Sequence, residues 1–279
     1  MIKLVVDSTC DLEQSILEEL NVCTLPITVD INGKVYKDKI DLTVDDFYKK
    51  IREKDVFPKT AQVIPSVMEN IFKDELEKGN EVVCITISSG LSGTYNSANI
   101  VKNMIGSDKI HIIDSRSASL GFGMIVIELA KMIKDGASVK QLIDRADYII
   151  RNQEAIAYVD SLEMLKRGGR ISPSAATLGG VLGIKPIIAI DNGLIKSIGK
   201  ARGKMNALKH LAGIINSNNI DKDIGLYVAH SNIDKGCDED LDIIKEYGVN
   251  HEITISHIGA AVGTHVGEGA LALFFVKKD

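Results

Sequence analysis

The sequence predicts an α/β protein of two domains. The N-terminal domain is expected to hold a mainly parallel sheet with flanking helices, and the C-terminal domain an α+β arrangement with a mixed or antiparallel sheet. In the first half, short apolar runs alternate with segments of helical periodicity, which is typical of a parallel sheet. In the second half, Asn192–Gly193 separates two apolar runs, a strong signal for a hairpin. The 279 residues suffice for two domains, and we place the boundary near Asn152, giving 1–152 and 153–279.

The elements of the first half follow from apolar runs and from residues that begin or end helices. Strands are expected at residues 4–6, 82–87 and 110–113, and a hairpin at 25–36 around the Asn32–Gly33 turn. Helices are expected at residues 12–20, 46–54, 67–78, 94–104 and 120–134. Ser, Thr and Asp residues, which are typical N-caps, precede the first two of these helices.

The second half mixes helices with more strands and turns. Helices are expected at residues 138–152, 205–216 and 238–246. Strands are expected at residues 155–159, 186–190, 194–198, 224–229, 251–255 and 270–276. Two glycine-containing segments, the basic segment 165–172 and the Gly-rich segment 259–269, are expected to be turns.

Three polar loops follow strands of the predicted parallel sheet: Asp7–Asp11, Ser88–Thr94 and Asp114–Ser119. Ligands of such sheets bind at the carboxyl ends of the strands, where these loops would lie. Ser88–Thr94 also opens a helix, whose first N–H groups are unpaired and whose dipole favours an anion. With the hydroxyls of Ser92 and Thr94, this loop indicates a carboxylate or phosphate site. A plain helix cap with a tight glycine turn explains the same residues equally well.

Composition excludes several classes of protein. The net charge is −5, from 33 Lys and Arg against 38 Asp and Glu, and no basic run suggests binding to nucleic acid. No apolar stretch reaches the roughly 18 residues of a membrane span. Residues 1–7 have the pattern of a strand rather than of a signal peptide, and the four cysteines lie far apart. We therefore expect a cytoplasmic protein with reduced thiols, whose contact with membranes would be transient.

Motifs for nucleotides, nucleophiles and metals are missing or incomplete. The chain has no G-x-x-x-x-G-K-[ST] phosphate loop. The Gly121-Phe122-Gly123 segment lacks the third glycine of a dinucleotide fingerprint and lies in an apolar helix. Gly90–Thr94 has Thr where a nucleophile elbow requires its last glycine. No His or Cys spacing is typical of a metal site, so we expect neither metal nor cofactor.

Two further residues are candidates for binding an anion. Thr60 lies in a polar connector before a helix, where the ordinary role of a Thr is to cap the helix. His265 lies in Gly263–Gly269, where three glycines let the backbone bring the imidazole close to another surface. From there the ring could donate a hydrogen bond to a carboxylate.

Basic side chains gather in two turn-like segments of the second half. Exposed loops are their ordinary interpretation. The alternative is a basic rim that guides or docks an anionic group. These residues are Arg167, Arg170, Lys200, Arg202 and Lys204.

Six short motifs occur in order along nearly the full length. They are Asp7-Ser8-Thr9-Cys10-Asp11-Leu12, Ser89-Gly90-Leu91-Ser92-Gly93-Thr94-Tyr95, Asp114-Ser115, Gly168-Gly169-Arg170-Ile171, Lys185-Pro186 and Gly263-Thr264-His265-Val266-Gly267. Together they resemble the DegV family, whose characterised members are the fatty-acid-binding (FakB-like) subunits of bacterial fatty acid kinase. The resemblance implies two α/β domains with a long-chain fatty acid between them, its chain in an apolar tunnel.

The resemblance also implies roles for individual residues. Thr60, Ser92 and His265 occupy the motif positions that bind the fatty acid carboxylate in the family. Further residues are assigned to the surroundings of the carboxylate or to partner docking: Gly93, Thr94, Arg170 and Arg202. One departure concerns the connector, where the family usually has T-S-Q-P-S. Here Ala61 replaces the Ser, and Val63–Ile64 is inserted, so the tunnel mouth is expected to differ.

The same resemblance implies a lipid-binding subunit without an ATP site of its own. A separate ATP-binding kinase subunit would convert the carboxylate to an acyl-phosphate, in the service of phospholipid metabolism. The missing nucleotide loops agree with this.

Two alternatives remain open from the residues. A serine hydrolase would use Ser92 as nucleophile and His265 as base, with Asp7 or Asp114 orienting the ring. A module for a small phosphorylated metabolite would use the anion-suited loop Ser88–Thr94 without any apolar tunnel.

Overall fold

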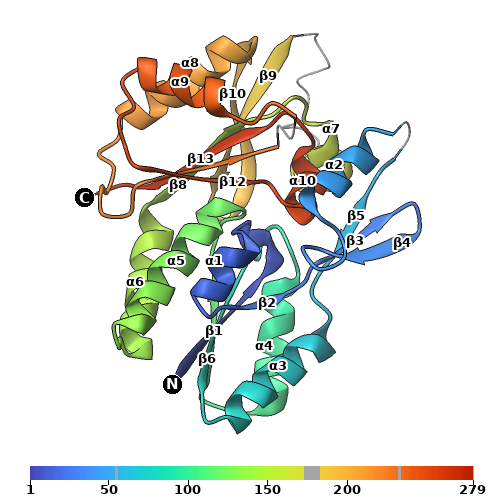
Figure 1. Cartoon of the computed structure of the whole chain (residues 1–279), viewed down its shortest axis with the longest axis vertical. Coiled ribbons are helices and arrows are strands. Elements are labelled where there is room, and N and C mark those ends of the chain that lie inside the picture. The colour runs from blue at the N-terminus through green and yellow to red at the C-terminus, as the bar shows by residue number, and fades with distance from the viewer. Residues whose placement is uncertain (54–55, 173–182, 232–233, 279) are drawn as a thin grey trace.

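The computed structural model describes residues 1–53, 56–172, 183–231 and 234–278, and it contains three sheets (Figure 1). The fold class expected from the sequence is confirmed. A parallel sheet lies in the N-terminal half and a mixed, mostly antiparallel sheet in the C-terminal half. The predicted boundary near Asn152 coincides with the end of one helix and the start of a strand at Gln153, and as a domain boundary it stays a prediction.

The N-terminal sheet has the order β2-β1-β6-β7, with all neighbouring strands parallel. Its strands are β1 (Ile2–Asp7), β2 (Cys23–Leu25), β6 (Glu81–Thr86) and β7 (Ile110–Asp114). Among the described residues, five helices belong to the same half of the chain, and a sixth, α2 (Val44–Ile51), is described below. The five are α1 (Gln14–Glu19), α3 (Pro65–Glu77), α4 (Thr94–Ile105), α5 (Leu120–Lys134) and α6 (Val139–Asn152). Alternating residues of β1 point into two different apolar cores, Leu4 and Val6 into one and Val5 into the other, as a sheet covered on both faces requires.

A small antiparallel sheet, in the order β4-β3-β5, projects beside the parallel one (Figure 1). Its strands are β3 (Thr28–Ile31), β4 (Lys34–Lys37) and β5 (Lys59–Ala61). The hairpin predicted around Asn32–Gly33 is confirmed. Thr43 caps α2 (Val44–Ile51) through its side chain, and the end predicted for this helix, at residue 54, lies outside the described residues.

The C-terminal sheet has the order β10-β9-β8-β13-β11-β12. Its strands are β8 (Gln153–Tyr158), β9 (Ile184–Asp191), β10 (Leu194–Arg202), β11 (Leu226–His230), β12 (Ile253–His257) and β13 (Leu271–Val276). The helices are α7 (Glu163–Arg167), α8 (Lys204–Asn216), α9 (Asp238–Glu246) and α10 (Ala260–Val266). Helices α8 and α9 cover one face of the sheet, and the β9–β10 hairpin confirms the prediction made from Asn192–Gly193.

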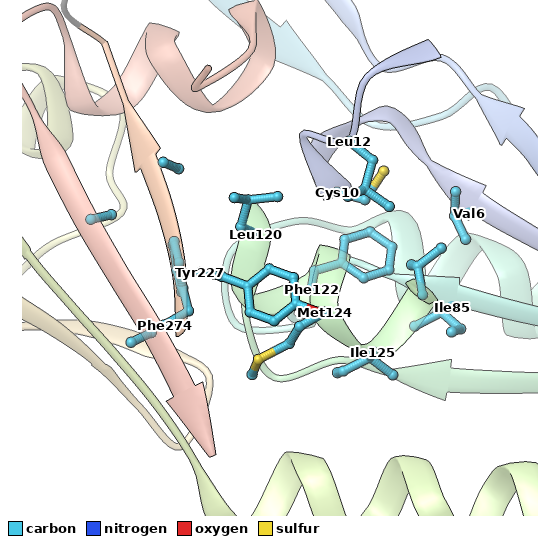
Figure 2. Packing of buried hydrophobic residues seen from close by; sticks show 14 of the residues in the cluster. Val6, Cys10, Leu12, Ile85, Leu120, Phe122, Met124, Ile125, Tyr227 and Phe274 are labelled. Carbon is cyan, nitrogen blue, oxygen red and sulfur yellow. The ribbon is translucent and has the colours of Figure 1, made fainter. Parts of the chain in front are cut away.

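Helix α5 joins the two large sheets into one apolar core. Figure 2 shows Leu120 and Met124 of α5 between Tyr227 and Phe274 of the C-terminal sheet and Ile85 of the N-terminal sheet. All of these side chains are nearly or fully buried. The two halves are therefore packed against each other, and not joined only by a linker.

Three local predictions were wrong. Residues 259–269 contain the helix α10, where a turn was expected, and residues 165–167 belong to the helix α7, whereas the turn expected at Gly168–Gly169 is confirmed. The first helix begins at Gln14 and not at residue 12, because Asp7 caps a separate 3-10 turn, η1 (Ser8–Cys10). Each error concerns a short helix, for which apolar periodicity has too few residues to be diagnostic.

Candidate ligand-binding site

The three candidates Thr60, Ser92 and His265 line one cavity of about 360 Å³, which we call the polar chamber. They come from three different elements: β5, the loop before α4, and the last turn of α10. Thr9, Gln62 and Arg170 are its other polar lining residues. As predicted, the chamber adjoins the carboxyl edge of the parallel sheet, because the loop that carries Ser92 follows β6.

Thr60 and His265 are hydrogen-bonded, with 2.9 Å between Oγ1 and Nε2. Thr60 was expected in an irregular connector. It lies instead in β5, where it pairs with Val29 of β3. The other ring nitrogen of His265, Nδ1, is buried and has no hydrogen-bond partner within the described part of the chain. Burial, together with the charge of Arg170, lowers the pKa of His265 to about 4, so the ring is neutral at neutral pH.

Gly168 explains how the His265 ring fits. A Cβ at this glycine would lie 2.2 Å from Nδ1 of His265, so any larger residue would displace the ring. Gly168 is therefore required on steric grounds, because a side chain there would collide with His265, which is far away in the sequence.

The loop before α4 presents Ser92 and Thr94 to each other, with 2.9 Å between their hydroxyl oxygens. Gly93 stands at the N-cap position of α4, and a Cβ there would lie 1.9 Å from Oε1 of Gln62. Gln62 in turn donates from Nε2 to Ser97 of α4, at 2.7 Å. Sequence reasoning missed Gln62. Its only signal was its position two residues after Thr60.

Arg170 supplies the positive charge of the chamber. Its guanidinium is half-buried, which lowers its pKa, and it donates from Nε to the carbonyl of Leu91 at 3.1 Å and from Nη1 to that of Gly168. Among the described residues no carboxylate forms an ion pair with Arg170. Arg202, the other basic residue singled out by the sequence, is exposed at the end of β10 and does not line the chamber.

The geometry does not assemble a catalytic triad. The described contacts include no hydrogen bond between Ser92 and His265. Asp7 accepts from Thr9 and from the amide of Ile87, at 2.7 Å for the amide. Asp114 accepts from the amides of Ser89 and Arg116, both at 3.0 Å, so neither carboxylate orients the His265 ring.

A second cavity, of about 60 Å³ and lined almost entirely by apolar side chains, adjoins the chamber; we call it the apolar channel. Its lining shares four residues with the chamber, namely Ala118, Ile195, Val262 and Val266. The channel lies between the C-terminal sheet, the helix α10 and the residues just before α5, Ala118 and Ser119.

Alanines on neighbouring strands make room for the channel. Ala272 of β13 pairs with Ala157 of β8 on one side and with Ala229 of β11 on the other. Ala157 and Ala272 line the channel, together with Ala155 and Ala270. The opposite face of β13 instead carries Leu271, Leu273 and Phe275, and that face is closed by α8 and α9. The face of β13 where the cavity lies thus carries the small side chains Ala270 and Ala272, with Phe274 as the large residue of its lining.

No helix in the described ranges is long and apolar enough to cross a membrane. Nor do the described His, Cys, Asp and Glu side chains form a group that could hold a metal ion.

Comparisons with known proteins agree with this architecture. A DegV domain-containing protein of Caldanaerobacter subterraneus is 34% identical over 281 residues, covering 99% of each chain. Among solved structures, a fatty-acid-binding DegV family protein of Thermus thermophilus superimposes with a TM-score of 0.89 at 28% identity, covering 99% of each chain. A stearic-acid-binding protein of Eubacterium ventriosum gives 0.88 at 29% identity, covering 100% of this chain and 99% of that one. The family model for the uncharacterised proteins of the DegV family matches residues 1–278, and this chain therefore belongs to the DegV family.

Proposed function

We propose that this protein binds a long-chain fatty acid, with the carboxylate in the polar chamber and the acyl chain in the apolar channel. The observation that carries the proposal is that a polar and an apolar cavity adjoin and share four lining residues, Ala118, Ile195, Val262 and Val266. A polar cavity beside an aliphatic one matches the two parts of a fatty acid, its carboxylate and its acyl chain. A small phosphorylated metabolite has no long apolar part that would fill the aliphatic cavity. The fatty-acid-binding relatives of similar structure support the same ligand class.

The chamber offers the donors that a carboxylate needs. A buried, unpaired carboxylate is costly, so its oxygens require hydrogen bonds and a compensating charge. The hydroxyls of Thr60 and Ser92 and the neutral ring of His265 supply hydrogen bonds. Since His265 is uncharged, Arg170 supplies the compensating positive charge.

The channel supplies most of the binding free energy. Each methylene transferred from water to an aliphatic environment contributes about 0.8 kcal/mol. The lining of alanine, valine and isoleucine contains almost no polar surface that would have to lose its water. We therefore expect affinity to rise with chain length until the channel is filled.

We further propose that the chain acts with a separate ATP-dependent kinase subunit and is not itself an enzyme. Three observations support this: the sequence has no phosphate loop, the chamber contains no catalytic triad, and the carboxylate would lie at a cavity that adjoins surface loops. In this proposal the protein carries fatty acids in the cytoplasm toward phospholipid metabolism, contacting membranes only transiently.

Native mass spectrometry of the freshly purified protein tests the ligand class. We expect an adduct with the mass of a fatty acid that is lost on delipidation and restored by adding stearic acid. A protein that binds no fatty acid, but binds a phosphorylated metabolite in competition with inorganic phosphate, would contradict the proposal. A fluorophosphonate adduct on Ser92 would instead favour the hydrolase.

The kinase partnership is tested separately with Arg202→Glu. Because Arg202 is exposed and outside the chamber, the variant should keep its bound lipid but lose acyl-phosphate formation with the partner kinase. Lys109→Glu, the same charge change at an exposed position before β7, is the matched control and should behave like wild type. Acyl-phosphate is measured by trapping with hydroxylamine. Loss of lipid from Arg202→Glu, or equal losses in both variants, would contradict this part of the proposal.

A further inference from the structure

Asp11 is a buried carboxylate that lines neither the polar chamber nor the apolar channel. It is 1% exposed and follows η1 with a left-handed backbone, φ 53° and ψ 20°. A non-glycine residue in this conformation carries a conformational cost, so the surrounding structure must hold it there. Its contacts show what holds it.

Three hydrogen bonds connect Asp11 to two distant parts of the chain. The hydroxyl of Ser119, at the N-cap of α5, donates to Oδ2 at 2.6 Å. The amide of Gly259, at the N-cap of α10, donates to Oδ1 at 3.0 Å. The hydroxyl of Ser256, in β12, donates to the carbonyl oxygen of Asp11 at 2.6 Å. Asp11 therefore joins the N-terminal sheet to the starts of α5 and α10.

Helix α10 depends on contacts from outside because its N-cap, Gly259, has no side chain that could cap the first turn. Two carboxylates of the N-terminal half act there instead: Asp11 accepts from the amide of Gly259, and Asp38 accepts from the amides of Ala260 and Ala261. The fit is close: a Cβ at Gly259 would lie 2.6 Å from Oδ1 of Asp11. With only seven residues, α10 has little stability apart from such contacts.

The two ends of α10 are thus held by the N-terminal half. Asp11 holds its first residues, and at the other end Thr60 meets His265. Between these ends, Val262 and Val266 form one side of the passage from the chamber to the channel. Ala118, just before the N-cap of α5, lines the same passage. Asp11 contacts the N-cap residues of both helices that adjoin this passage, Ser119 of α5 and Gly259 of α10.

We propose that Asp11 is a positioning residue of the fatty-acid site, which fixes α10 so that the His265 ring meets Thr60 at the polar chamber. The inference rests on the proposed function for its ligand, whereas the position of His265 can be measured without any ligand. Lys39 and Asp38 are the charged groups nearest to Asp11, and Lys39 donates from Nζ to the carbonyl of Leu12 at 2.7 Å.

The test compares Asp11→Ala with Asp11→Asn. Asn retains an oxygen that can accept from the amide of Gly259, and burial already raises the pKa of Asp11 to about 7, so a neutral side chain is tolerated there. We expect Asp11→Ala to weaken stearic acid binding at least 10-fold and Asp11→Asn to remain within about threefold of wild type. NMR titration of the His265 ring in delipidated protein, assigned with His265→Gln, is the second measurement. In Asp11→Ala its pKa should rise from about 4 toward the ordinary value, because the ring is no longer held in its buried position.

Ser138→Ala is the matched control for stability. Ser138 caps α6 in a complete capping box far from α10, so its loss should lower the melting temperature without moving the His265 titration. Gly259→Ala strains the same contact from the other side. It should weaken binding in the wild type but have no further effect in Asp11→Ala, where the clashing carboxylate is absent. This pair also covers the case in which Asp11→Ala alone folds poorly.

An unchanged His265 titration in Asp11→Ala, or an equal shift in Ser138→Ala, would overturn the inference. A wild-type protein that binds no fatty acid would overturn the proposed function instead, and the His265 titration would still decide the position of α10.

Discussion

Replacing His265 with alanine is expected to weaken fatty acid binding by about 10- to 100-fold, because a hydrogen bond to a charged group contributes about 1.5–3 kcal/mol. The change also leaves the hydroxyl of Thr60 without its ring partner. The measurement is isothermal titration with palmitic and stearic acid on delipidated protein. His210→Ala, at an exposed position of α8, is the control and should bind as wild type does. Wild-type affinity in His265→Ala would show that the carboxylate does not lie at this ring.

The low pKa of His265 adds a pH test to this variant. In the unfolded chain the ring takes up a proton near its ordinary pKa of 6.5, but in the folded protein only near 4. Between these values the unfolded state binds more protons, so this residue lowers stability as the pH falls from about 6.5 to 4. His265→Ala lacks that contribution. The difference in unfolding free energy between wild type and variant should therefore shift in favour of the variant as the pH falls through this window.

Replacing Ala272 with phenylalanine is expected to shorten the acyl chain that the protein accepts. The ring would project from the middle of β13 into the apolar channel, between Ala157 and Ala229. Displacing about four methylenes at about 0.8 kcal/mol each costs about 3 kcal/mol, or a loss of roughly 100-fold for stearic acid. We expect octanoic acid, whose chain is shorter, to bind as it does to wild type.

Leu273→Phe is the control for overpacking. It adds an aromatic ring to the next residue of β13, but on the face that α8 and α9 cover. Both variants should lose some melting temperature, since extra volume in a packed core costs about 1–3 kcal/mol. Only Ala272→Phe should change the dependence of affinity on chain length. Equal losses for octanoic and stearic acid would place the acyl chain elsewhere.

The parallel sheet and its loops could be predicted from the sequence, since their signals are local. The apolar run of β6, followed by the Ser88–Thr94 loop and the helix α4, determined that an anion-suited helix start would lie at the carboxyl edge of the sheet. Asn32–Gly33 and Asn192–Gly193 likewise marked their hairpins, because two-residue turns require backbone conformations that these residues adopt easily.

The setting of His265 could not be predicted in the same way. The segment Gly259–Gly269 looked like a turn because its glycines disfavour helix. Helix α10 forms there with Asp11 and Asp38 as acceptors at its start. Gly263 is required because a Cβ would lie 2.6 Å from the hydroxyl of Tyr48. Both reasons lie in parts of the chain that no local pattern connects to this segment.

By itself, then, the sequence determined the fold class, the order of the longer strands and helices, and the kinds of side chain available to hold an anion. Only the tertiary structure decided which of them meet. Thr60 and His265 are 205 positions apart in the chain and 2.9 Å apart in space, and the alanines of β8 and β13 line a channel only because their register pairs them. Periodicity records how each segment is buried, whereas a binding site depends on which buried segments pack together, and that is set by the packing of the whole chain.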